Sequence, residues 1–304
     1  MTELKLEDTG KINPKLGVII EEIKLETIRN TIKSKFNSIN NFAKFINCPP
    51  WQLSFLLNKR SNPNIELVDR ISKSLEIKLT DLVKKIIVHG RPNSSFISSS
   101  TFPINVTSEL ASLIGHTFGD GHVSSHFSFT NTSRTLIADV IKKVNSLPIK
   151  RLTHSRHFHK ATIVVFSSLV KDILVAFGAP LGNKVTTSIS IPEWIKNGDS
   201  EIKGAFLQAL FDDEGTVSGR QISIGLSKKI ELEGNLDELL NDLKTLLSDL
   251  SVNGVFISKI RGTKNGKNGT TIWKSLTING VLNFQKFENE IGFLHPKKKH
   301  NLSK

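Results

Sequence analysis

The 304-residue sequence predicts an α+β protein in which two similar halves follow a smaller, all-helical domain. Apolar residues recur at helical spacing through residues 27–88. A serine-rich stretch bracketed by prolines, residues 91–103, is typical of a linker. Beyond it, the order helix, strand, strand, helix, strand, strand, helix occurs twice, and alternation of period two marks the strands. We therefore expect domains at 1–90, 104–199 and 200–304.

The composition excludes several classes of protein. Hydrophobic residues make up 38% and charged residues 23%, as in soluble globular chains. No apolar run approaches the roughly 20 residues of a membrane span, and the N-terminal stretch MTELKLEDTGKINPK lacks the apolar segment of a secretory signal. Cys48 is the single cysteine, which excludes an intramolecular disulfide and a cysteine-rich zinc site. We expect an intracellular protein, in the cytoplasm, the nucleoid or an organelle.

The net charge of +13 indicates a polyanionic partner. Residues 1–100 hold 16 Lys and Arg against 10 Asp and Glu, and residues 101–304 hold 25 against 18. Both parts are therefore basic. A positive field spread over the chain favours nucleic acid, because neutralising phosphates releases counterions. The alternative is a basic protein whose charge serves solubility alone.

Each half opens on a similar apolar segment, LIGHTFGDGHV in the first and LQALFDDEGTV in the second. Aligned, the two segments pair Gly115 with Ala209 and Asp120 with Glu214, 94 residues apart. Gly115 is a costly choice, because glycine in a helix interior loses about 1 kcal/mol relative to alanine. Asp120 adds negative charge where a helix end is already negative. Locally unfavourable choices of this kind often mark a functional site.

These two segments resemble the signature helices of single-chain, two-motif LAGLIDADG homing endonucleases, and the resemblance covers residues 104–300. It implies a pseudo-two-fold pair of αββαββα repeats, with saddle-shaped antiparallel sheets that follow the DNA major groove. It also implies that the two motif helices pack side by side, with Gly115 and Ala209 at their contact. Asp120 and Glu214 then project from the helix ends toward the DNA.

The paired acids predict a metal site. Two carboxylates at adjacent helix ends repel each other, and a divalent cation relieves that repulsion. Oxygen ligands with room for water and phosphate suit Mg²⁺, which activates water for phosphodiester hydrolysis. The alternative is a pair of solvent-exposed capping acids. By resemblance, Asp120 and Glu214 are the metal-binding and catalytic acids, the carbonyls of Gly119 and Asp213 add ligands, and Lys274 lies near the scissile phosphate.

The first motif departs from the family pattern at His116, Thr117 and Phe118. Histidine is a good zinc ligand, so a zinc site is an alternative. The placement of several histidines on a basic hairpin instead favours contacts with phosphates or bases. The histidines concerned are His116, His122 and His126 around the motif, and His154, His157 and His159 in the hairpin.

The second strand pair of each half carries basic residues that we expect to bind DNA. A two-stranded ribbon fits the major groove and can read base edges. The alternative is an ordinary solvated hairpin. The candidates are Lys150, Arg151, Arg156 and Lys160 in the first half, and Lys259, Arg261, Lys264 and Lys267, together with Lys274, in the second.

The stretch from Ser38 to Leu82 resembles a lambda-repressor-like helix-turn-helix. Ser38 is suited to cap the first helix of that motif, and Pro49–Pro50 to start the next. The resemblance makes residues 49–57 a recognition helix. Alternatively, its two large aromatic residues pack on another domain or a partner. The DNA-binding candidates are Gln52 for a base, and Lys59 and Arg60 for phosphates.

Together these features predict a monomeric, site-specific double-strand DNA endonuclease that uses Mg²⁺ and recognises a long target, with no membrane partner. A DNA-binding regulator that keeps the fold without cutting is one alternative, and an RNA-splicing maturase is another. The absence of tyrosine and of an aromatic platform disfavours the reading of single-stranded RNA. An intein is disfavoured, because the chain starts with Met rather than Cys or Ser and its first hundred residues are predicted to be helical.

Overall fold

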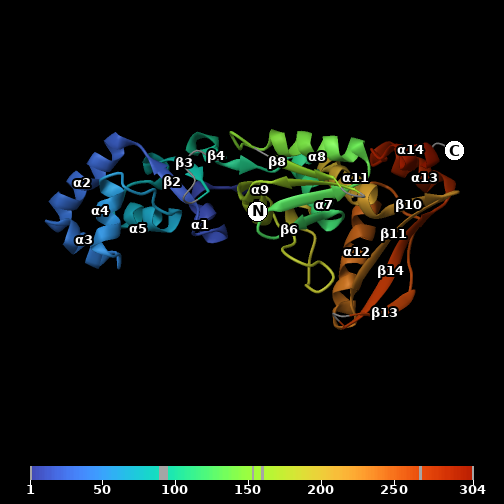
Figure 1. Cartoon of the computed structure of the whole chain (residues 1–304). Helices are drawn as coiled ribbons and strands as arrows, with labels where there is room; N and C mark the ends of the chain where they lie inside the picture. Colours follow the sequence, from blue (N-terminus) through green and yellow to red (C-terminus); the bar gives the residue numbers. More distant parts are fainter. Residues whose placement is uncertain (1, 89–94, 153, 159–160, 267–268, 303–304) are drawn as a thin grey trace.

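The computed structural model describes residues 2–88, 95–152, 154–158, 161–266 and 269–302. A largely helical unit lies at one end of the molecule, and two mixed halves of helix and sheet lie at the other (Figure 1). Every strand pairing among the described residues is antiparallel. These features confirm the predicted α+β class. None of the described helices is long and apolar enough to cross a membrane.

The N-terminal unit is built on short helices that begin at the expected signals. The Ser38 side chain accepts the Asn41 N–H at 3.1 Å, as an N-cap does, and Pro50 occupies the first position of the next helix. The helices are η1 (Leu6–Asp8), α1 (Thr9–Ile12), α2 (Glu22–Phe36), α3 (Ile39–Phe45), α4 (Pro50–Leu57), α5 (Ile65–Leu75) and α6 (Leu79–Leu82).

A three-stranded sheet completes this unit, which corrects the expectation of an all-helical domain. Its strands are β2 (Gly17–Ile20), β3 (Val83–Ile87) and β4 (Phe96–Ser98), in the order β2-β3-β4. Strand β4 lies within the predicted linker 91–103, of which residues 91–94 are outside the described residues. Serines flank the Phe-Ile pair of this strand, so the sequence shows no strand pattern there, although the isoleucine is buried. A 3-10 turn, η2 (Ser99–Thr101), follows this strand.

Contacts outside the linker region tie the N-terminal unit to the first half. Strand β1 (Glu3–Leu4), at the start of the chain, pairs with β5 (Ile104–Asn105). The Asn13 side chain donates to a carboxylate oxygen of Asp172, in helix α9 (Ser168–Ala176) of the first half, at 3.1 Å. The buried apolar residues of both parts form one continuous core. The unit is therefore joined to the first half by more than a connecting segment.

The first half packs its helices against one face of a four-stranded sheet. Phe127, Phe129 and Val164 are fully buried on that face, as the alternation in the sequence requires. The sheet order is β6-β7-β9-β8. The elements are α7 (Ser108–Phe118), β6 (Gly121–Val123), β7 (Phe127–Asn131), α8 (Arg134–Ser146), β8 (His154–Phe158), β9 (Thr162–Phe166), α9 (Ser168–Ala176) and α10 (Glu193–Lys196).

The second half repeats this plan with longer strands. Its sheet order is β10-β11-β14-β12, with β13 paired to β14 further along, and the long helix α12 covers one face. Ile272, Leu276 and Ile278 are fully buried in this sheet. The elements are α11 (Ser200–Glu214), β10 (Gly215–Ser218), β11 (Gln221–Lys229), η3 (Ile230–Leu232), α12 (Glu233–Asp249), β12 (Val255–Ile257), β13 (Gly262–Gly266), β14 (Gly269–Asn279), α13 (Val281–Glu290) and α14 (Pro296–Leu302).

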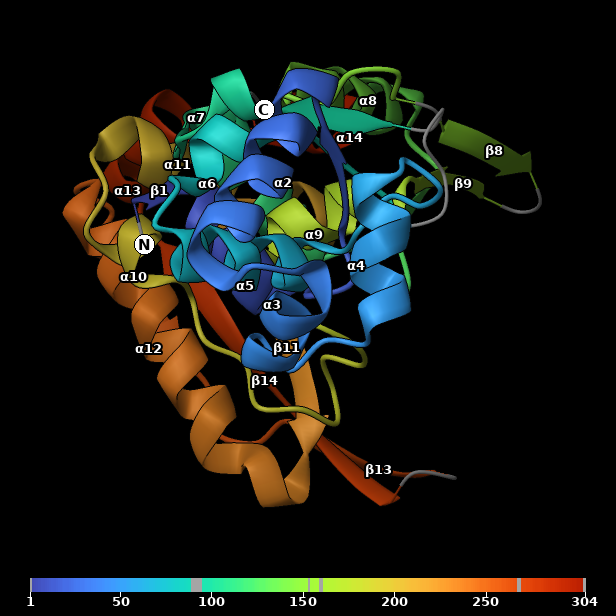
Figure 2. The ribbon, with the colours of Figure 1, turned by 90° about the vertical axis from the view of Figure 1, so that its left-hand side faces the viewer.

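The outer strands of the two sheets extend away from the body of the molecule. In Figure 2, β8 with β9 and β13 project toward the same side of the view, one from each half. The described part of the molecule therefore presents two projecting hairpins, one from each half.

Candidate active site at the paired helix ends

Helices α7 and α11 lie side by side (Figure 1). Their backbones approach closely at Gly115, which has no side chain. A Cβ atom added to Gly115 would lie 2.4 Å from the carbonyl oxygen of Phe206 and 2.9 Å from the Cβ of Ala209. No side chain fits in that space, so glycine is required where the two backbones approach each other. The local cost of Gly115 in a helix is therefore offset by helix–helix packing.

This contact brings the two motif acids into one electrostatic cluster. Glu214 is the last residue of α11, whereas Asp120 lies in the turn that follows α7. The Asn131 side chain donates to an Asp120 carboxylate oxygen at 2.7 Å. Burial raises the pKa of Asp120 to about 6, and the negative charges of Asp213 and Glu214 add to the rise. Burial likewise raises the pKa of Glu214. A cation between these carboxylates would relieve both effects.

The Asp213 side chain has a role that the sequence interpretation missed. One of its carboxylate oxygens, Oδ2, lies 3.0 Å from His116 Nδ1 and accepts the backbone N–H of Asp120 at 3.0 Å. Its other oxygen, Oδ1, is buried without a hydrogen-bond partner. The sequence offered only two hints: an acid immediately before Glu214 in the second motif, and a histidine in the first motif. The sequence could not show that the two side chains meet.

Two lysines contact the carbonyl oxygens at the helix ends. The Lys184 ammonium donates to the carbonyls of Gly119 and Gly121, the latter at 2.9 Å. The Lys298 ammonium donates to the carbonyls of Phe211 at 3.0 Å, Asp212 at 2.5 Å and Asp213 at 3.3 Å. The carbonyls of Gly119 and Asp213, which the resemblance makes metal ligands, accept hydrogen bonds from these ammonium groups, and their role as ligands stays a prediction.

Each of these lysines contacts the end of one motif helix, Lys184 that of α7 and Lys298 that of α11. Lys184 lies in the loop between α9 and α10, and Lys298 lies in α14 at the end of the second half. A cation near a helix C-terminus is favoured by the helix dipole and by the unpaired carbonyls there. Burial lowers the pKa of both ammonium groups. Because their sequence distances from the two acids differ, the repeat alignment could not identify them as a pair.

A buried lysine holds the loop that carries Lys184. Lys228, on β11, is only 2% exposed, and its ammonium donates to the carbonyls of Lys184 at 2.6 Å and Thr187 at 2.7 Å. Burial, followed by the charge of Lys184, lowers the pKa of Lys228 to about 8. A cavity of about 170 Å³ opens between this loop and α11, and Glu214 is among the residues that line it. The acid site therefore adjoins an open space.

Metal-ligating side chains other than the paired acids are sparse. Within the described residues, no group of three or more His, Cys, Asp or Glu side chains is arranged to hold a metal ion. A cation held by Asp120 and Glu214 would therefore complete its coordination with water or phosphate oxygens, as Mg²⁺ commonly does. The zinc alternative gains no support from this arrangement, because His116 contacts Asp213 and the hairpin residue His159 lies outside the described residues.

Lys274, predicted to lie near a scissile phosphate, forms its ion pairs with helix α12 rather than with the paired acids. Lys274 is 6% exposed, and its ammonium lies 2.7 Å from Glu233 and 2.7 Å from Asp237, both on α12. The residue lies on the sheet face covered by that helix. Alternation along the strand predicts which sheet face Lys274 occupies. It does not predict that a separate helix, α12, covers that face and supplies two acidic partners.

Asp212 is an anchor for the C-terminal segment rather than a member of the acid pair. Its carboxylate accepts the backbone N–H groups of Leu294 at 3.1 Å and His295 at 2.8 Å. Burial raises the pKa of this carboxyl to about 6. The expectation that Glu214, not Asp212, stands opposite Asp120 is consistent with these contacts.

The basic candidates of the first half lie mainly at its edge. Lys150 and Arg151 precede β8 instead of lying within it, and Lys150 pairs through its backbone with Phe96 of β4. Arg151 lies 5.9 Å from the centre of the Phe96 ring. Arg156 is exposed on the edge strand β8, and Lys160 lies outside the described residues.

The basic candidates of the second half surround an open, polar sheet face. Lys259 and Lys264 are exposed, Arg261 lies 5.9 Å from the centre of the Trp273 ring, and Lys267 is outside the described residues. Paired strands carry side chains on this face that can donate and accept hydrogen bonds. They are Thr216, Gln221, Ser223, Ser227 and Thr271, on the face opposite Ile272, Leu276 and Ile278. Ser275 and Thr277 lie on the same face but are buried.

In the N-terminal unit, the predicted recognition helix corresponds to α4. Trp51 is 61% exposed and Phe55 is 38% exposed, with their ring centres 5.6 Å apart. Gln52 Oε1 lies 3.6 Å from the Cys48 thiol. Lys59 forms an ion pair with Glu22 of α2, and Arg60 lies 5.9 Å from the centre of the Phe55 ring.

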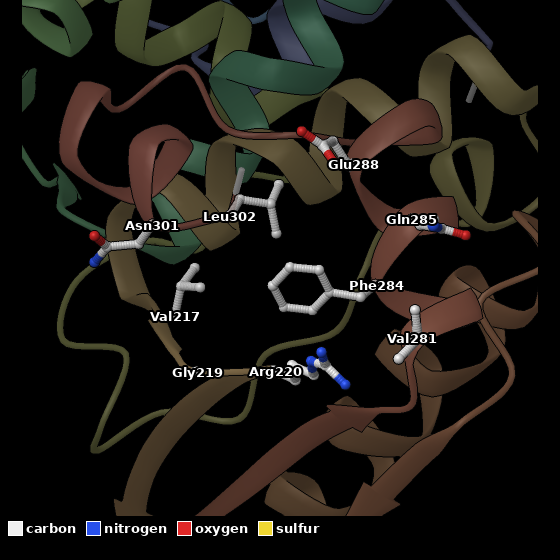
Figure 3. A pocket seen from close by; sticks show the side chains of 9 residues that line it. All are labelled: Val217, Gly219, Arg220, Val281, Phe284, Gln285, Glu288, Asn301 and Leu302. Atoms are coloured by element: carbon white, nitrogen blue, oxygen red, sulfur yellow. The ribbon is translucent and has the colours of Figure 1, made fainter. Parts of the chain in front are cut away.

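A larger cavity, of about 690 Å³, lies apart from the acids between α13, α14 and the turn joining β10 to β11 (Figure 3). Val217, Phe284 and Leu302 give it an apolar floor, with Arg220 and Glu288 at its rim. It shares no lining residue with the site of Asp120 and Glu214.

The second half of the chain matches a known protein family. Residues 201–292, which include α11 and the second sheet, match the family described as the LAGLIDADG-like domain. This match supports the resemblance that the motifs indicated. The first half contains the motif with the departures at His116, Thr117 and Phe118.

Curated relatives are matched over only a small part of their length. The tRNA-splicing ligase RtcB of Methanopyrus kandleri is 29% identical over 62% of this chain and 21% of its own length. RtcB of Pyrococcus furiosus is 28% identical over 62% of this chain and 22% of its length. The replication factor C small subunit of Methanocaldococcus jannaschii is 27% identical over 50% of this chain and 9% of its own length. The chain thus spans about a fifth or less of these proteins.

Two solved structures are similar to parts of the chain. I-DmoI in complex with DNA and Mn has a TM-score of 0.42 and 17% identity, covering 62% of this chain and 98% of that chain. Full-length DUF199/WhiA from Thermatoga maritima has a TM-score of 0.40 and 16% identity, covering 64% of this chain and 58% of that chain.

Proposed function

We propose, from the premise that this chain carries a LAGLIDADG-like domain over residues 201–292, that it is a site-specific endonuclease of double-stranded DNA. One observation carries the proposal: Asp120 and Glu214 lie at the ends of two packed helices, half-buried and with raised pKa values, and the charge of Glu214 acts on Asp120. Structural proteins rarely maintain such a cluster, because neighbouring buried carboxylates destabilise one another. A nuclease site uses it to attract a cation.

The residues present fit a divalent cation, and we propose Mg²⁺. Asp120 and Glu214 would hold it, and the cation would supply Lewis acidity at a phosphodiester and lower the pKa of a bound water. Asn131 fixes the orientation of the Asp120 carboxylate through its hydrogen bond. We assign to Lys184, rather than Lys274, the task of placing positive charge beside a phosphate. Lys184 adjoins both acids, whereas Lys274 is engaged by α12.

The DNA would lie along the open faces of the two sheets. In the second half this face combines hydroxyl and amide side chains with exposed Arg261 and Lys264, a composition suited to base edges and phosphates. In the first half, the exposed Arg156 would contribute from the sheet edge at β8, because its register partner, Val164, is buried on the helix-packed face. We propose that α3 and α4 act as a helix-turn-helix, in which Gln52 reads a base and Arg60 and Lys59 bind phosphates. Phosphate binding by Lys59 requires exchange of its ion pair with Glu22.

The direct test is cleavage of a plasmid library of candidate targets by the full chain with Mg²⁺. The control is the double variant Asp120→Asn/Glu214→Gln, which keeps the shape of both side chains. We expect cuts in a unique sequence by the wild-type protein and none by the control. Binding of the recovered duplex, measured in Ca²⁺, should weaken steeply with salt, because phosphate contacts release counterions.

Three outcomes would overturn this function. Tight, selective binding of a duplex by a wild-type protein that never cuts it would favour the DNA-binding regulator. Binding that is absent or insensitive to salt would remove DNA as the partner. Selective binding of a structured RNA instead would favour the maturase.

A further inference from the structure

Asp213 connects the two acids through one side chain. It is adjacent to Glu214 in α11, and its carboxylate crosses the helix interface to accept the N–H of Asp120 at 3.0 Å. The side chain is fully buried. A residue that is covalently next to one acid and hydrogen-bonded to the backbone of the other constrains the distance between them.

The first motif is shaped to receive this side chain. His116 Nδ1 lies 3.0 Å from the same Asp213 oxygen, and the imidazole is 1% exposed. A Cβ on Gly119 would lie 2.4 Å from the Cβ of Asp213 and 2.5 Å from Oδ2. Any residue other than glycine at position 119 would therefore displace the carboxylate from the Asp120 turn. The His116 and Gly119 positions of the first motif thus complement an acid of the second.

We infer that Asp213 is a positioning residue for the metal-binding acids, held by His116 and admitted by Gly119. The inference rests on the proposed function for its chemistry, because it assigns Asp213 to the arrangement of Asp120 and Glu214. Its carboxylate fixes the Asp120 turn through a charge-assisted hydrogen bond and adds negative charge behind the cation site. Asp213 itself need not touch DNA or metal.

Three variants separate these contributions. Asp213→Ala removes both the acceptor and the charge, whereas Asp213→Asn keeps an acceptor oxygen for the Asp120 N–H and removes the charge. Asp212→Asn is the matched control, because it alters the neighbouring buried acid, which anchors Leu294 and His295 instead of the Asp120 turn.

The first readout is hydrogen exchange of the Asp120 amide in the full chain without DNA or metal. We expect Asp213→Ala to speed this exchange about tenfold, while Asp213→Asn and Asp212→Asn leave it near the wild-type rate. Amides elsewhere in α7 and α11 serve as the measure of general destabilisation. Unchanged exchange at Asp120 in Asp213→Ala, or equal acceleration throughout both helices, would overturn the positioning role.

The second readout is direct binding of Mn²⁺, followed by the electron paramagnetic resonance signal of the free ion. Residues that support ligands typically contribute 10- to 100-fold to metal affinity. We expect about a 10- to 100-fold loss in Asp213→Ala and a smaller loss in Asp213→Asn. Equal Mn²⁺ affinity in wild type and Asp213→Ala would contradict the inference.

Cleavage then distinguishes this inference from the proposed function. If the wild type cuts DNA, Asp213→Ala should need more metal for half-maximal cleavage while its affinity for DNA in Ca²⁺ is unchanged. A loss of cleavage that no metal concentration restores would contradict positioning. If the wild type binds Mn²⁺ through these residues but never cuts, the positioning role stands and the nuclease function fails.

Discussion

The two halves of the repeat end their motif helices differently. Helix α11 continues through Glu214, whereas α7 stops at Phe118 and delivers Asp120 from the following turn. Asn131 donates to the Asp120 carboxylate, but the matching register position in the second half is Leu226, which offers no hydrogen bond. The first acid is therefore oriented by its own half, while the second relies on its helix.

The sheets differ in the same sense. The open face of the second half carries Ser, Thr and Gln side chains, together with the exposed Trp273 and Phe256, on strands of up to 11 residues. The corresponding face of the first half includes Ile163 and Val165, on strands of five residues. This comparison teaches that the paired acids come from two halves whose surfaces are not equivalent. We expect the second half to make more of the polar contacts with a duplex.

The largest effect should come from the acids themselves. We expect Asp120→Asn and Glu214→Gln each to slow cleavage by about 10³-fold or more, because a bound cation contributes several kcal/mol to the barrier and each 1.36 kcal/mol is tenfold in rate. Binding of DNA in Ca²⁺ should stay near normal. The two losses should be similar despite the different local structures. The measurement is single-turnover cleavage of a cognate duplex.

The same variants test the comparison through stability. Burial raises the pKa of Asp120 to about 6, so its charge at neutral pH opposes folding when no metal is bound. Allowing for solvent screening, Asp120→Asn should raise the free energy of unfolding by about 1 kcal/mol without metal. Full cleavage activity in either acid variant would eliminate the proposed site. A much smaller loss in one of them would mean that the halves are not equal partners.

A smaller, unequal effect is expected from the two lysines. Lys184 contacts the carbonyls on either side of Asp120, and its charge acts on Glu214 more strongly than that of Lys298. We expect Lys184→Met to slow cleavage about 100-fold and Lys298→Met about tenfold, in the range typical of residues that support a metal site. The measurement is again single-turnover cleavage, with thermal unfolding to separate loss of fold from loss of rate.

Lys184→Arg is the control for charge alone. If charge beside the phosphate is what matters, the arginine variant should retain more activity than the methionine variant. Equal losses for Lys184 and Lys298 would indicate that both lysines act only as caps of the helix ends.

The sequence predicted the repeated architecture because that information is local. Period-two and 3.6-residue patterns give the element order. The helix contact at Gly115 and Ala209 was implied by the resemblance of the two motifs to the LAGLIDADG family. The strands around the predicted linker were missed because a three-residue strand among serines leaves almost no pattern. Their pairing depends on Val83–Ile87, a segment that was interpreted as helical.

The site was predictable only where the repeat constrained it. Asp120 and Glu214 follow from alignment of the two motifs. Lys184, Lys298 and the His116–Asp213 contact depend on tertiary neighbours that no periodicity reveals. Lys274 shows the converse: a lysine on a predicted strand was assigned to DNA, although two acids of α12 engage it. Strand alternation indicates a face but not the element that covers it.

The smallest predicted effect concerns Lys228, which links the halves by holding the Lys184 loop from β11. Its folded pKa is lowered to about 8, mainly by burial, whereas an unfolded lysine titrates near about 10.4. Between these values the unfolded chain binds more protons than the folded one. The contribution of Lys228 to the free energy of unfolding therefore increases with pH across that window. After allowance for residual solvation, the increase should be about 1 kcal/mol.

Lys228→Gln isolates this contribution, because glutamine retains an amide donor for the loop carbonyls but does not titrate. Urea unfolding of both proteins at several pH values from about 7 to about 10 gives the comparison, with other lysines contributing equally to each. The stability difference between wild type and variant should shift in favour of the wild type as the pH rises. This follows because the cost of a buried ammonium disappears while its hydrogen bonds to Lys184 and Thr187 remain. A pH-independent difference would mean that Lys228 titrates as a solvated lysine. The loop that carries Lys184 would then be open to water.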